Sequence, residues 1–366
     1  MTTTDTQQSL TVELVRTVDE VLTRECPLAV VRECAHSDTR WQTLWQIASD
    51  LGWPALGVPQ DLGGIGLGVA AAVDVLERAG AALFPAPLLS TTAAVAVLSS
   101  LSHTESPAAE ALGRIAHGAV ATLAVVDADE HSVVRWDHTG LTGTKTDVTD
   151  LPRAELFVVT AMPADDQAAT VAVVDTGAER RVRENIDPTR PLGELVLRHT
   201  PGLYAGTGPD RGLAAARLLV AAELVGVAQR ALDVATAHAR ERVQFGRRIG
   251  AFQAVKHRLA DMYVAVERAR SLVRAAAADL DDEPASALSR GLLGPLGTAV
   301  AMARAAASEA ALLAARGAIQ VSGALGITDE YDLIHVLRRA QQGAHVLGDP
   351  RRDYAAVGAA LVEELR

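Results

Sequence analysis

Two stretches of the chain carry side chains suited to holding an anionic ligand that includes a flat ring. The first, RVQFGRRIGAFQAVKHRLADM, covers residues 242–262, and the second, QVSGALGITDEY, covers residues 320–331. In the first stretch Arg242 offers a planar cationic fork that fits a pyrophosphate, and Phe245 offers a flat apolar surface. A glutamine in each stretch adds an amide group for polar ring atoms. The side chains suited to such a ligand are those of Arg242, Phe245, Gln253 and Gln320.

Helices are predicted to form the N-terminal third of the chain, residues 1–118. Apolar residues recur at three- and four-residue spacing in LTVELVRTVDEVLTREC and in RWQTLWQIASDLGW, which is typical of amphipathic helices. The stretch GVPQDLGGIGLG, residues 57–68, breaks this pattern because proline and glycine disfavour helix. We therefore expect an N-terminal helical domain with a loop at residues 57–68.

The pattern changes to short runs rich in Val and Thr between residues 119 and 203. The runs are VATLAVVD, SVVRW, LTGTKTDV, ELFVVTA, TVAVVDT and GELVLRHT. Asp, Gly, Pro and Asn separate them, as is typical of strands joined by turns. The sequence predicts a small antiparallel β domain in the middle of the chain.

Helical periodicity returns in the last part, residues 204–366. The stretch AARLLVAAELVGVAQRALDVATAHARERVQFG, residues 215–246, predicts one long helix. In the next predicted helix, apolar residues from Phe252 to Val273 are spaced alternately three and four, as in the seam of a packed bundle. Two more helices are predicted over residues 297–323 and 331–346. Four long helices favour an antiparallel bundle. The predicted fold class is mostly α with a small β domain.

Composition narrows the possible partners and the compartment. The 366 residues carry a net charge of −11, which disfavours nucleic acid or an anionic membrane as the main partner. Cys26 and Cys34 are too few for a disulfide framework and indicate reduced thiols. The start MTTTDTQQSL is unlike a signal peptide, and charge or glycine interrupts the apolar stretches. These features predict a cytoplasmic protein.

Several motifs together resemble the acyl-CoA dehydrogenase family. The family signature Arg-x-x-Phe-Gly, Phe-Gln and His-x-Leu-Ala-Asp-Met is present between Arg242 and Met262. LGWPALGVPQDLGGIGLG resembles the N-terminal loop of the family, and QVSGALGITDEY resembles its Gly-rich turn, with Ala324 in place of a glycine. The resemblance implies a helical domain, a β domain and a four-helix bundle. It also implies that five residues contact the FAD of a neighbouring subunit: Arg242, Phe245, Gln253, Gln320 and Gly323.

The same resemblance shows that the usual catalytic base is missing. Family members remove the α-proton of an acyl-CoA with a glutamate, which in most lies 21 residues after the last glycine of the Gly-rich turn. That position is Leu347, counted from Gly326. A minority of members place the glutamate on the first bundle helix, at the position of Ala216. Neither leucine nor alanine can accept a proton, so no catalytic residue is predicted in this chain.

Other groups near these positions stay open as alternative bases. Asp349 and His345 flank Leu347 in the sequence, and Glu223 follows Ala216 by seven residues, on the same helix face and about 10 Å away. With Asp349 or Glu223 as base, the chain would be a self-sufficient homomeric dehydrogenase. A flavin-dependent monooxygenase of the same fold, which needs no α-base, and a non-enzymatic scaffold are further alternatives.

The β domain also departs from the family. VVDADEHSVVRWD and KTDVTDL stand where the resemblance leads us to expect segments that line the flavin ring and the acyl chain. The residues that would reach a neighbour's FAD are kept, whereas those of the chemical half-site are lost. This combination resembles the non-catalytic type of subunit in actinobacterial heteromeric (α2β2) steroid acyl-CoA dehydrogenases. It implies a homologous catalytic partner subunit, a bulky acyl-CoA substrate and an electron-transfer flavoprotein as electron acceptor.

Overall fold

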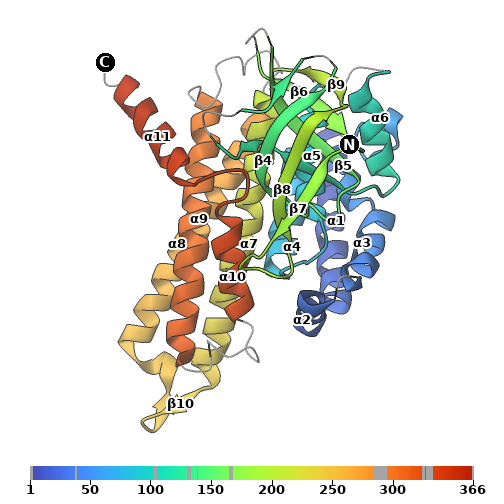
Figure 1. The fold of residues 1–366 in the computed structure, drawn as a ribbon. Helices are drawn as coiled ribbons and strands as arrows, with labels where there is room; N and C mark the ends of the chain where they lie inside the picture. Colours follow the sequence, from blue (N-terminus) through green and yellow to red (C-terminus); the bar gives the residue numbers. More distant parts are fainter. Residues whose placement is uncertain are drawn as a thin grey trace.

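The computed structural model describes residues 3–37, 39–101, 105–129, 133–137, 139–164, 168–282, 295–323, 326 and 333–364. Helices precede and follow a sheet, and the long C-terminal helices extend beyond the rest of the molecule at one end (Figure 1). The predicted class, mostly α with a small β domain, is confirmed.

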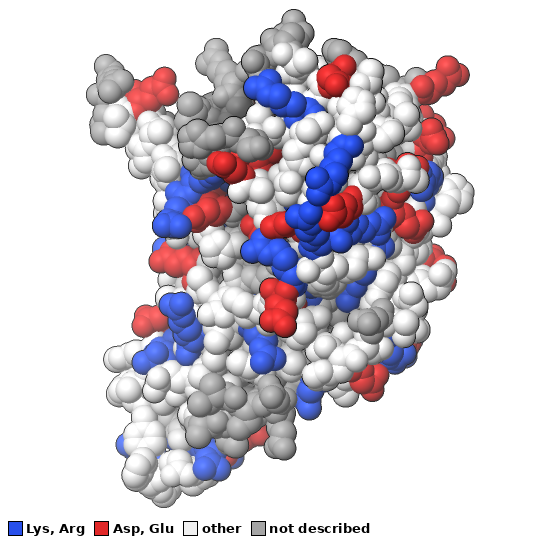
Figure 2. All heavy atoms as spheres, viewed as in Figure 1, with Lys and Arg blue, Asp and Glu red and all other residues white. Residues whose placement is uncertain are grey.

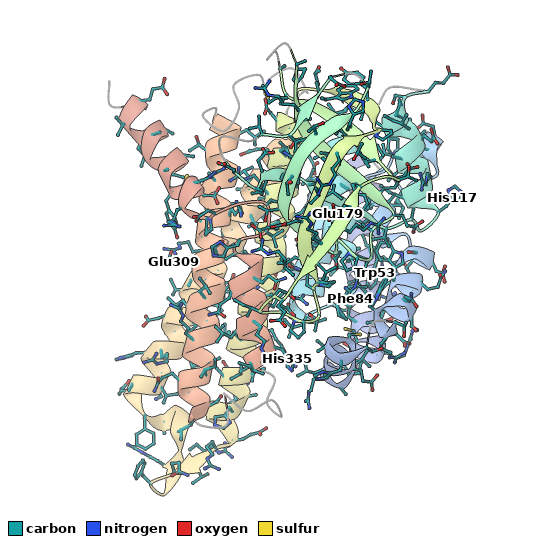
Figure 3. The ribbon with its side chains drawn as sticks, viewed as in Figure 1. Trp53, Phe84, His117, Glu179, Glu309 and His335 are labelled. Carbon is teal, nitrogen blue, oxygen red and sulfur yellow. The ribbon has the colours of Figure 1, made fainter. Side chains whose placement is uncertain are left out.

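Helices form the part of the chain before the sheet. They are α1 (Thr3–Glu25), α2 (Leu28–His36), α3 (Arg40–Asp50), α4 (Val69–Ala81), α5 (Leu88–Leu101) and α6 (Pro107–Ala116). Helix α5 is apolar on all sides and is almost wholly buried, as its sequence LLSTTAAVAVLSSL requires. The predicted loop at residues 57–68 contains only a short 3₁₀ turn, Gln60–Leu62. Trp53, which lies shortly before this loop in the sequence, packs against Phe84 with ring centroids 5.9 Å apart (Figure 3).

The middle of the chain forms a mixed sheet. Its strands are β1 (Ala121–Ala124), β2 (Val126–Asp127), β3 (Arg135–Trp136), β4 (Leu141–Thr149), β5 (Leu156–Pro163), β6 (Thr170–Val174), β7 (Glu179–Arg183), β8 (Leu192–Thr200) and β9 (Leu203–Thr207). Most pairs are antiparallel, but β1 and β3 each pair with β5 in parallel, which the sequence analysis did not expect. It also missed β7 and β9. Strand β7 is the fully exposed, charged segment ERRVR, which has no apolar alternation to mark it.

Acidic and basic side chains alternate over the exposed side of this sheet. Figure 2 shows arginines and carboxylates interspersed there. Glu179 pairs with Arg181 at 2.7 Å and with Arg198 at 3.3 Å, and Arg183 lies 3.5 Å from Glu194. Charges of this kind protect the edge strand β7 from pairing with another chain.

The C-terminal helices are α7 (Asp210–Glu241), α8 (Gln253–Asp282), α9 (Pro295–Ser322), α10 (Leu333–Gly343) and α11 (Arg351–Glu364). Helix α7 ends five residues earlier than predicted, because residues 242–248 turn back as the tight hairpin β10 (Val243–Gln244) and β11 (Arg247–Arg248). Helix α11 was not predicted. Most of its residues are exposed, so it lacks a strong apolar stripe.

Two of these helices, α7 and the part of α9 from Leu296 to Ser322, are long and apolar enough to cross a membrane. Charged residues do interrupt both, as expected, because Arg217 and Glu223 lie in α7 and Arg304 and Glu309 lie in α9. Their most apolar windows are 83% and 67% buried within the fold, so their composition reflects packing against other helices.

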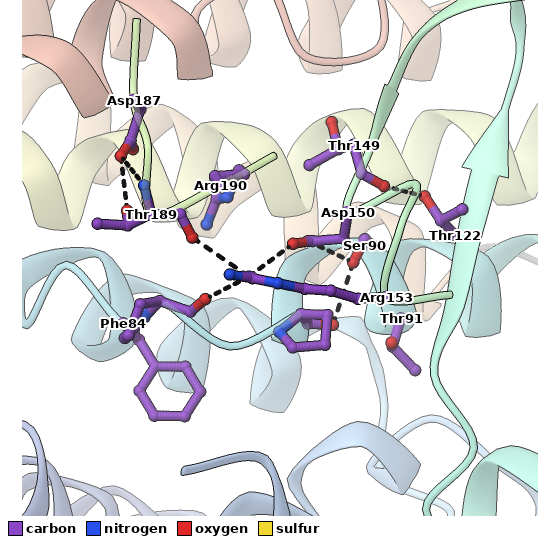
Figure 4. A network of polar contacts seen from close by, with 12 residues as sticks. Phe84, Ser90, Thr91, Thr122, Thr149, Asp150, Arg153, Asp187, Thr189 and Arg190 are labelled. Atoms are coloured by element: carbon purple, nitrogen blue, oxygen red, sulfur yellow. Dashed lines mark hydrogen bonds and ion pairs between the residues drawn. The ribbon is translucent and has the colours of Figure 1, made fainter. Parts of the chain in front are cut away.

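A buried polar network joins the helical N-terminal part to the sheet (Figure 4). Nη1 of Arg153 donates to the backbone oxygens of Pro85 at 2.7 Å and Thr189 at 3.2 Å, and to Asp150 at 3.0 Å. The hydroxyl of Ser90 donates to the other oxygen of Asp150 at 2.8 Å. Because these polar groups satisfy one another, the network fixes how the two parts meet.

Candidate functional site

The hairpin between α7 and α8 presents the first two predicted binding residues, Arg242 and Phe245, to solvent. The backbone of Ile249 donates to the oxygen of Arg242 at 2.8 Å and closes the hairpin. Phe245 occupies the tip with φ 52° and its side chain is 91% exposed. Its ring packs edge-on against the ring of Phe252, with ring centroids 6.2 Å apart. The guanidinium of Arg247 stacks on the Phe252 ring, 4.1 Å from the ring centroid. Val243 on the same hairpin is also exposed, so the tip of the hairpin presents apolar surface to solvent.

The remaining binding residues lie at the same end of the bundle. Gln253 is the first residue of α8, and Gln320 and Gly323 are at the C-terminal end of α9; all three are exposed. Helices α8 and α9 run antiparallel, since Gly317 packs against Met262 and Glu309, earlier in α9, pairs with Arg268, later in α8. The structure thus brings all five predicted binding residues to the hairpin end of the bundle. Residues 324–325 and 327–332 of the Gly-rich turn, including Ala324, lie outside the described residues.

A cavity of about 400 Å³ lies elsewhere, between strand β2, the first turns of α7 and the turn that joins α10 to α11. Leu347 lines it, with φ 61°, in a turn that ends the α10 segment. Ala216 lies on α7 in the same apolar cluster, fully buried. The two positions at which the family places its glutamate therefore lie near one spot, and both are apolar.

One carboxylate, Asp127, lies among the described residues that line the cavity. Its oxygen accepts a hydrogen bond from Nζ of the buried Lys145 at 2.7 Å and another from the backbone of Val134 at 2.8 Å. Burial lowers the pKa of Lys145, and the charge of Asp127 partly offsets that effect. Asp127 is thus committed to an ion pair, which makes it a poor general base. The sequence analysis missed this pair, because its partners are far apart in the chain.

Arg304 on α9 holds the turn that carries Leu347. Nη2 of this buried side chain donates to the backbone oxygens of Val346 and Gly348, both at 2.7 Å. Nη1 lies 3.1 Å from Asp353, which also accepts a hydrogen bond from Arg217 at 2.6 Å. This unit of Arg217, Arg304 and Asp353 was not predicted, since only the fold brings α7, α9 and α11 together.

The alternative bases do not line the cavity. Glu223 is 1% exposed and forms a two-pronged ion pair with Arg190. Burial alone would raise the pKa of Glu223, but the positive charge of Arg190 lowers it by more. The pKa of Glu223 therefore lies below its ordinary value. Asp349 binds the side chain and backbone of Arg351, both at 2.9 Å, and these bonds lower its pKa. His345 is exposed.

The hairpin and the cavity of one chain are far apart. Ala216 and Glu241 both belong to the continuous helix α7 and are 25 residues apart. At a rise of 1.5 Å per residue this corresponds to about 38 Å. Side chains of the hairpin therefore cannot reach the cavity of their own chain.

Comparison with known proteins identifies the family. The acyl-CoA dehydrogenase N-terminal domain matches residues 8–119 and the acyl-CoA dehydrogenase C-terminal domain matches residues 209–349. Acyl-CoA dehydrogenase IpdE2 of Mycolicibacterium smegmatis is 34% identical over 343 residues, covering 93% of this chain and 95% of that protein. The protein of the same name from Mycobacterium tuberculosis is 35% identical over 338 residues, covering 92% of each.

Solved structures agree with this result. A variant of the steroid ACAD Tcur3481-Tcur3483 matches with a TM-score of 0.88 and 25% identity, over 98% of this chain and 99% of that chain. The ChsE4-ChsE5 complex from Mycobacterium tuberculosis matches with a TM-score of 0.85 and 26% identity, over 96% of this chain and 97% of that chain. These findings confirm the resemblance inferred from the motifs. The chain belongs to the acyl-CoA dehydrogenase family of FAD-dependent oxidoreductases.

Proposed function

We propose that this chain is the subunit of a heteromeric acyl-CoA dehydrogenase that lacks the catalytic glutamate and holds the FAD of a homologous catalytic subunit. The separation of about 38 Å between its hairpin and its own cavity carries this proposal. A binding surface that cannot serve its own chain must serve a neighbour. The similarity to the ChsE4-ChsE5 complex and to the steroid ACAD supports a neighbour that is a related but different chain.

The exposed end of the bundle fits a neighbour's FAD. Arg242 offers a fork for the pyrophosphate, Phe245 a flat surface, and Gln253 and Gln320 amides for polar edges; all four side chains are exposed. The backbone at Gly323, with φ 63° and open space around its α-carbon, permits a close approach. These residues would position the cofactor by binding it, with no proton transfer of their own.

Chemistry in the complex would be the α,β-dehydrogenation of a CoA thioester. The bound FAD would supply the acceptor for the hydride. Leu347 and Ala216 cannot accept the α-proton, so the base would be a carboxylate of the partner subunit. We propose a bulky acyl group of the steroid class as substrate, following the steroid ACAD to which the chain is similar. Electrons would pass to an electron-transfer flavoprotein.

Exchange of Arg242 tests the role of the hairpin. In the purified complex with a catalytic homologue, Arg242→Ala should lower the FAD content several-fold, because a charge-assisted hydrogen bond to the pyrophosphate is lost. Arg240→Ala is the matched control, since Arg240 is also exposed at the same helix end. The measurement is the visible absorbance of flavin per mole of complex after gel filtration. Full retention of FAD by Arg242→Ala, or equal loss in both variants, would contradict the proposal.

A further inference from the structure

Helix α11 is fixed at its start and exposed along the rest of its length. Asp353 in its first turn is fully buried and binds Arg217 at 2.6 Å and Arg304 at 3.1 Å. The hydroxyl of Tyr354 donates to a backbone oxygen of α9 at 3.5 Å. No residue from 354 to 363, in contrast, is buried. The helix therefore leaves the body of the molecule in a fixed direction, at the end of the bundle away from the hairpin (Figure 1).

One side of α11 is a continuous apolar surface. At 3.6 residues per turn, six of its exposed residues fall within about 160° of the helix circumference. They are Tyr354, Ala355, Gly358, Ala359, Leu361 and Val362. The three largest, Tyr354, Leu361 and Val362, are 52%, 56% and 53% exposed. The buried Asp353 lies on the opposite side of the helix.

Such a helix gains stability from packing along its apolar side. Helix α11 has 14 residues, and isolated helices of about this length are only marginally stable in water. Gly358 in its middle lowers the helix propensity further. Burial of the exposed apolar side against another molecule offsets both effects.

The charges at the two ends of α11 indicate what covers it. Arg351 begins the helix on the apolar side, and its side chain is 87% exposed. It binds Asp349, but an exposed guanidinium has further N–H donors for a second carboxylate. Glu363 is exposed near the other end. A second α11 that runs in the opposite direction would bring its own Glu363 to Arg351, and its own Arg351 to Glu363. The helix is thus complementary to itself.

We propose that α11 packs antiparallel against α11 of a second copy of this chain, about a two-fold axis near Gly358. A two-fold contact uses the same surface of both copies, so each favourable pair occurs twice. Tyr354 of one copy lies near Leu361 of the other, and Arg351 near Glu363. One helix from each copy makes a small interface, so the dissociation constant is on the order of micromolar.

This contact goes beyond the proposed role in FAD binding, which concerns the opposite end of the bundle. The hairpin joins this chain to a catalytic subunit, whereas α11 joins two such pairs. The assembly then contains two copies of each chain.

Sedimentation equilibrium of the full-length protein, alone and in its complex with a catalytic homologue, tests the contact. Val362→Asp should raise the dissociation constant at least about tenfold, because two carboxylates enter an apolar interface. Val182→Asp is the matched control, since Val182 is 58% exposed on β7, and it should leave the constant unchanged. Both residues are exposed in the single chain, so neither change removes buried packing. Equal constants for the two variants, or a wild-type chain that never self-associates at micromolar concentration, overturn the proposal.

An exchange of charges distinguishes a second copy from any other partner. Glu363→Arg should weaken self-association several-fold, because it brings arginines together. The double variant Arg351→Glu, Glu363→Arg should return the dissociation constant to within about twofold of the wild-type value, since both ion pairs form again with reversed sign. It also places each charge favourably for the helix dipole, so α11 stays helical. Failure of the double variant to restore association overturns the antiparallel contact.

Flavin content separates this contact from the role of the hairpin. In the complex, Val362→Asp should halve the native mass while the FAD content per pair of unlike chains stays the same. Arg242→Ala should instead lower the FAD content and leave the α11 contact in place. Release of the catalytic subunit by Val362→Asp would show that α11 binds that subunit, and would overturn the proposal.

Discussion

Glu223 shows how a candidate catalytic residue becomes a structural one when its surroundings are known. It is buried at the point where α7 meets two arginines from other segments, and its charge is matched by Arg190 and, at 3.6 Å, by Arg339. Arg339 in turn binds Asp187 at 2.5 Å and Thr189 at 2.7 Å. A carboxylate held by two buried cations is stabilised as an anion, so it does not serve as a proton acceptor near neutral pH.

Neutralising Glu223 is therefore predicted to affect folding. Glu223→Gln leaves Arg190 without its buried counterion, and we expect a loss of about 3–5 kcal/mol in the free energy of unfolding. Glu309→Gln is the control, since Glu309 pairs with Arg268 on the surface, and it should change stability by less than about 1 kcal/mol. Urea denaturation of both variants measures the difference. A Glu223→Gln variant that keeps wild-type stability but loses dehydrogenase activity would instead identify a base.

At the level of elements, close contact between α4 and α7 depends on glycine. A side chain on Gly226 would place its Cβ 1.9 Å from the backbone oxygen of Glu77, and one on Gly80 would lie 2.1 Å from the oxygen of Glu223. Each helix thus uses a glycine to let the backbone of the other approach. This crossing anchors the N-terminal helices on the bundle that carries the cavity and the hairpin.

Substitution of one glycine tests this contact. Gly226→Ala should destabilise the protein by more than about 2 kcal/mol, because the backbones must move apart. Gly358→Ala on α11 is the matched control: nothing lies within 4 Å of the added carbon, and alanine favours helix, so stability should stay equal or rise by up to about 1 kcal/mol. Thermal unfolding compares them. Equal unfolding temperatures for the two variants would contradict the close crossing.

The elements also show where sequence information ends. Periodicity located α1, α3, the bundle helices and most strands, because apolar burial imposes a regular spacing. It extended α7 to Gly246 because RVQFG contains no strong helix breaker before its glycine. The unit of Arg217, Arg304 and Asp353 left no pattern in the sequence, since its members come from three separate helices. The five binding residues were found by resemblance to a family motif.

At the scale of the whole molecule, the chain has two separate candidate regions. The hairpin end of the bundle is exposed, whereas the cavity near the sheet has one carboxylate among its described lining residues, Asp127, which is paired with Lys145. The distance of about 38 Å along α7 means that each region can act only with what lies beside it. An assembly of unlike chains would complete both a cofactor site at the hairpin and a base that this chain does not have.

The FAD content and native mass of the assembly test this account most directly. The chain should be purified alone and after co-expression with a homologue that keeps the glutamate. We predict that the chain alone contains little FAD, and that the mixed assembly contains about one FAD for each pair of unlike chains, because cofactor and subunits stabilise one another. A stable homomer of this chain with one FAD per subunit and activity on an acyl-CoA would contradict the account.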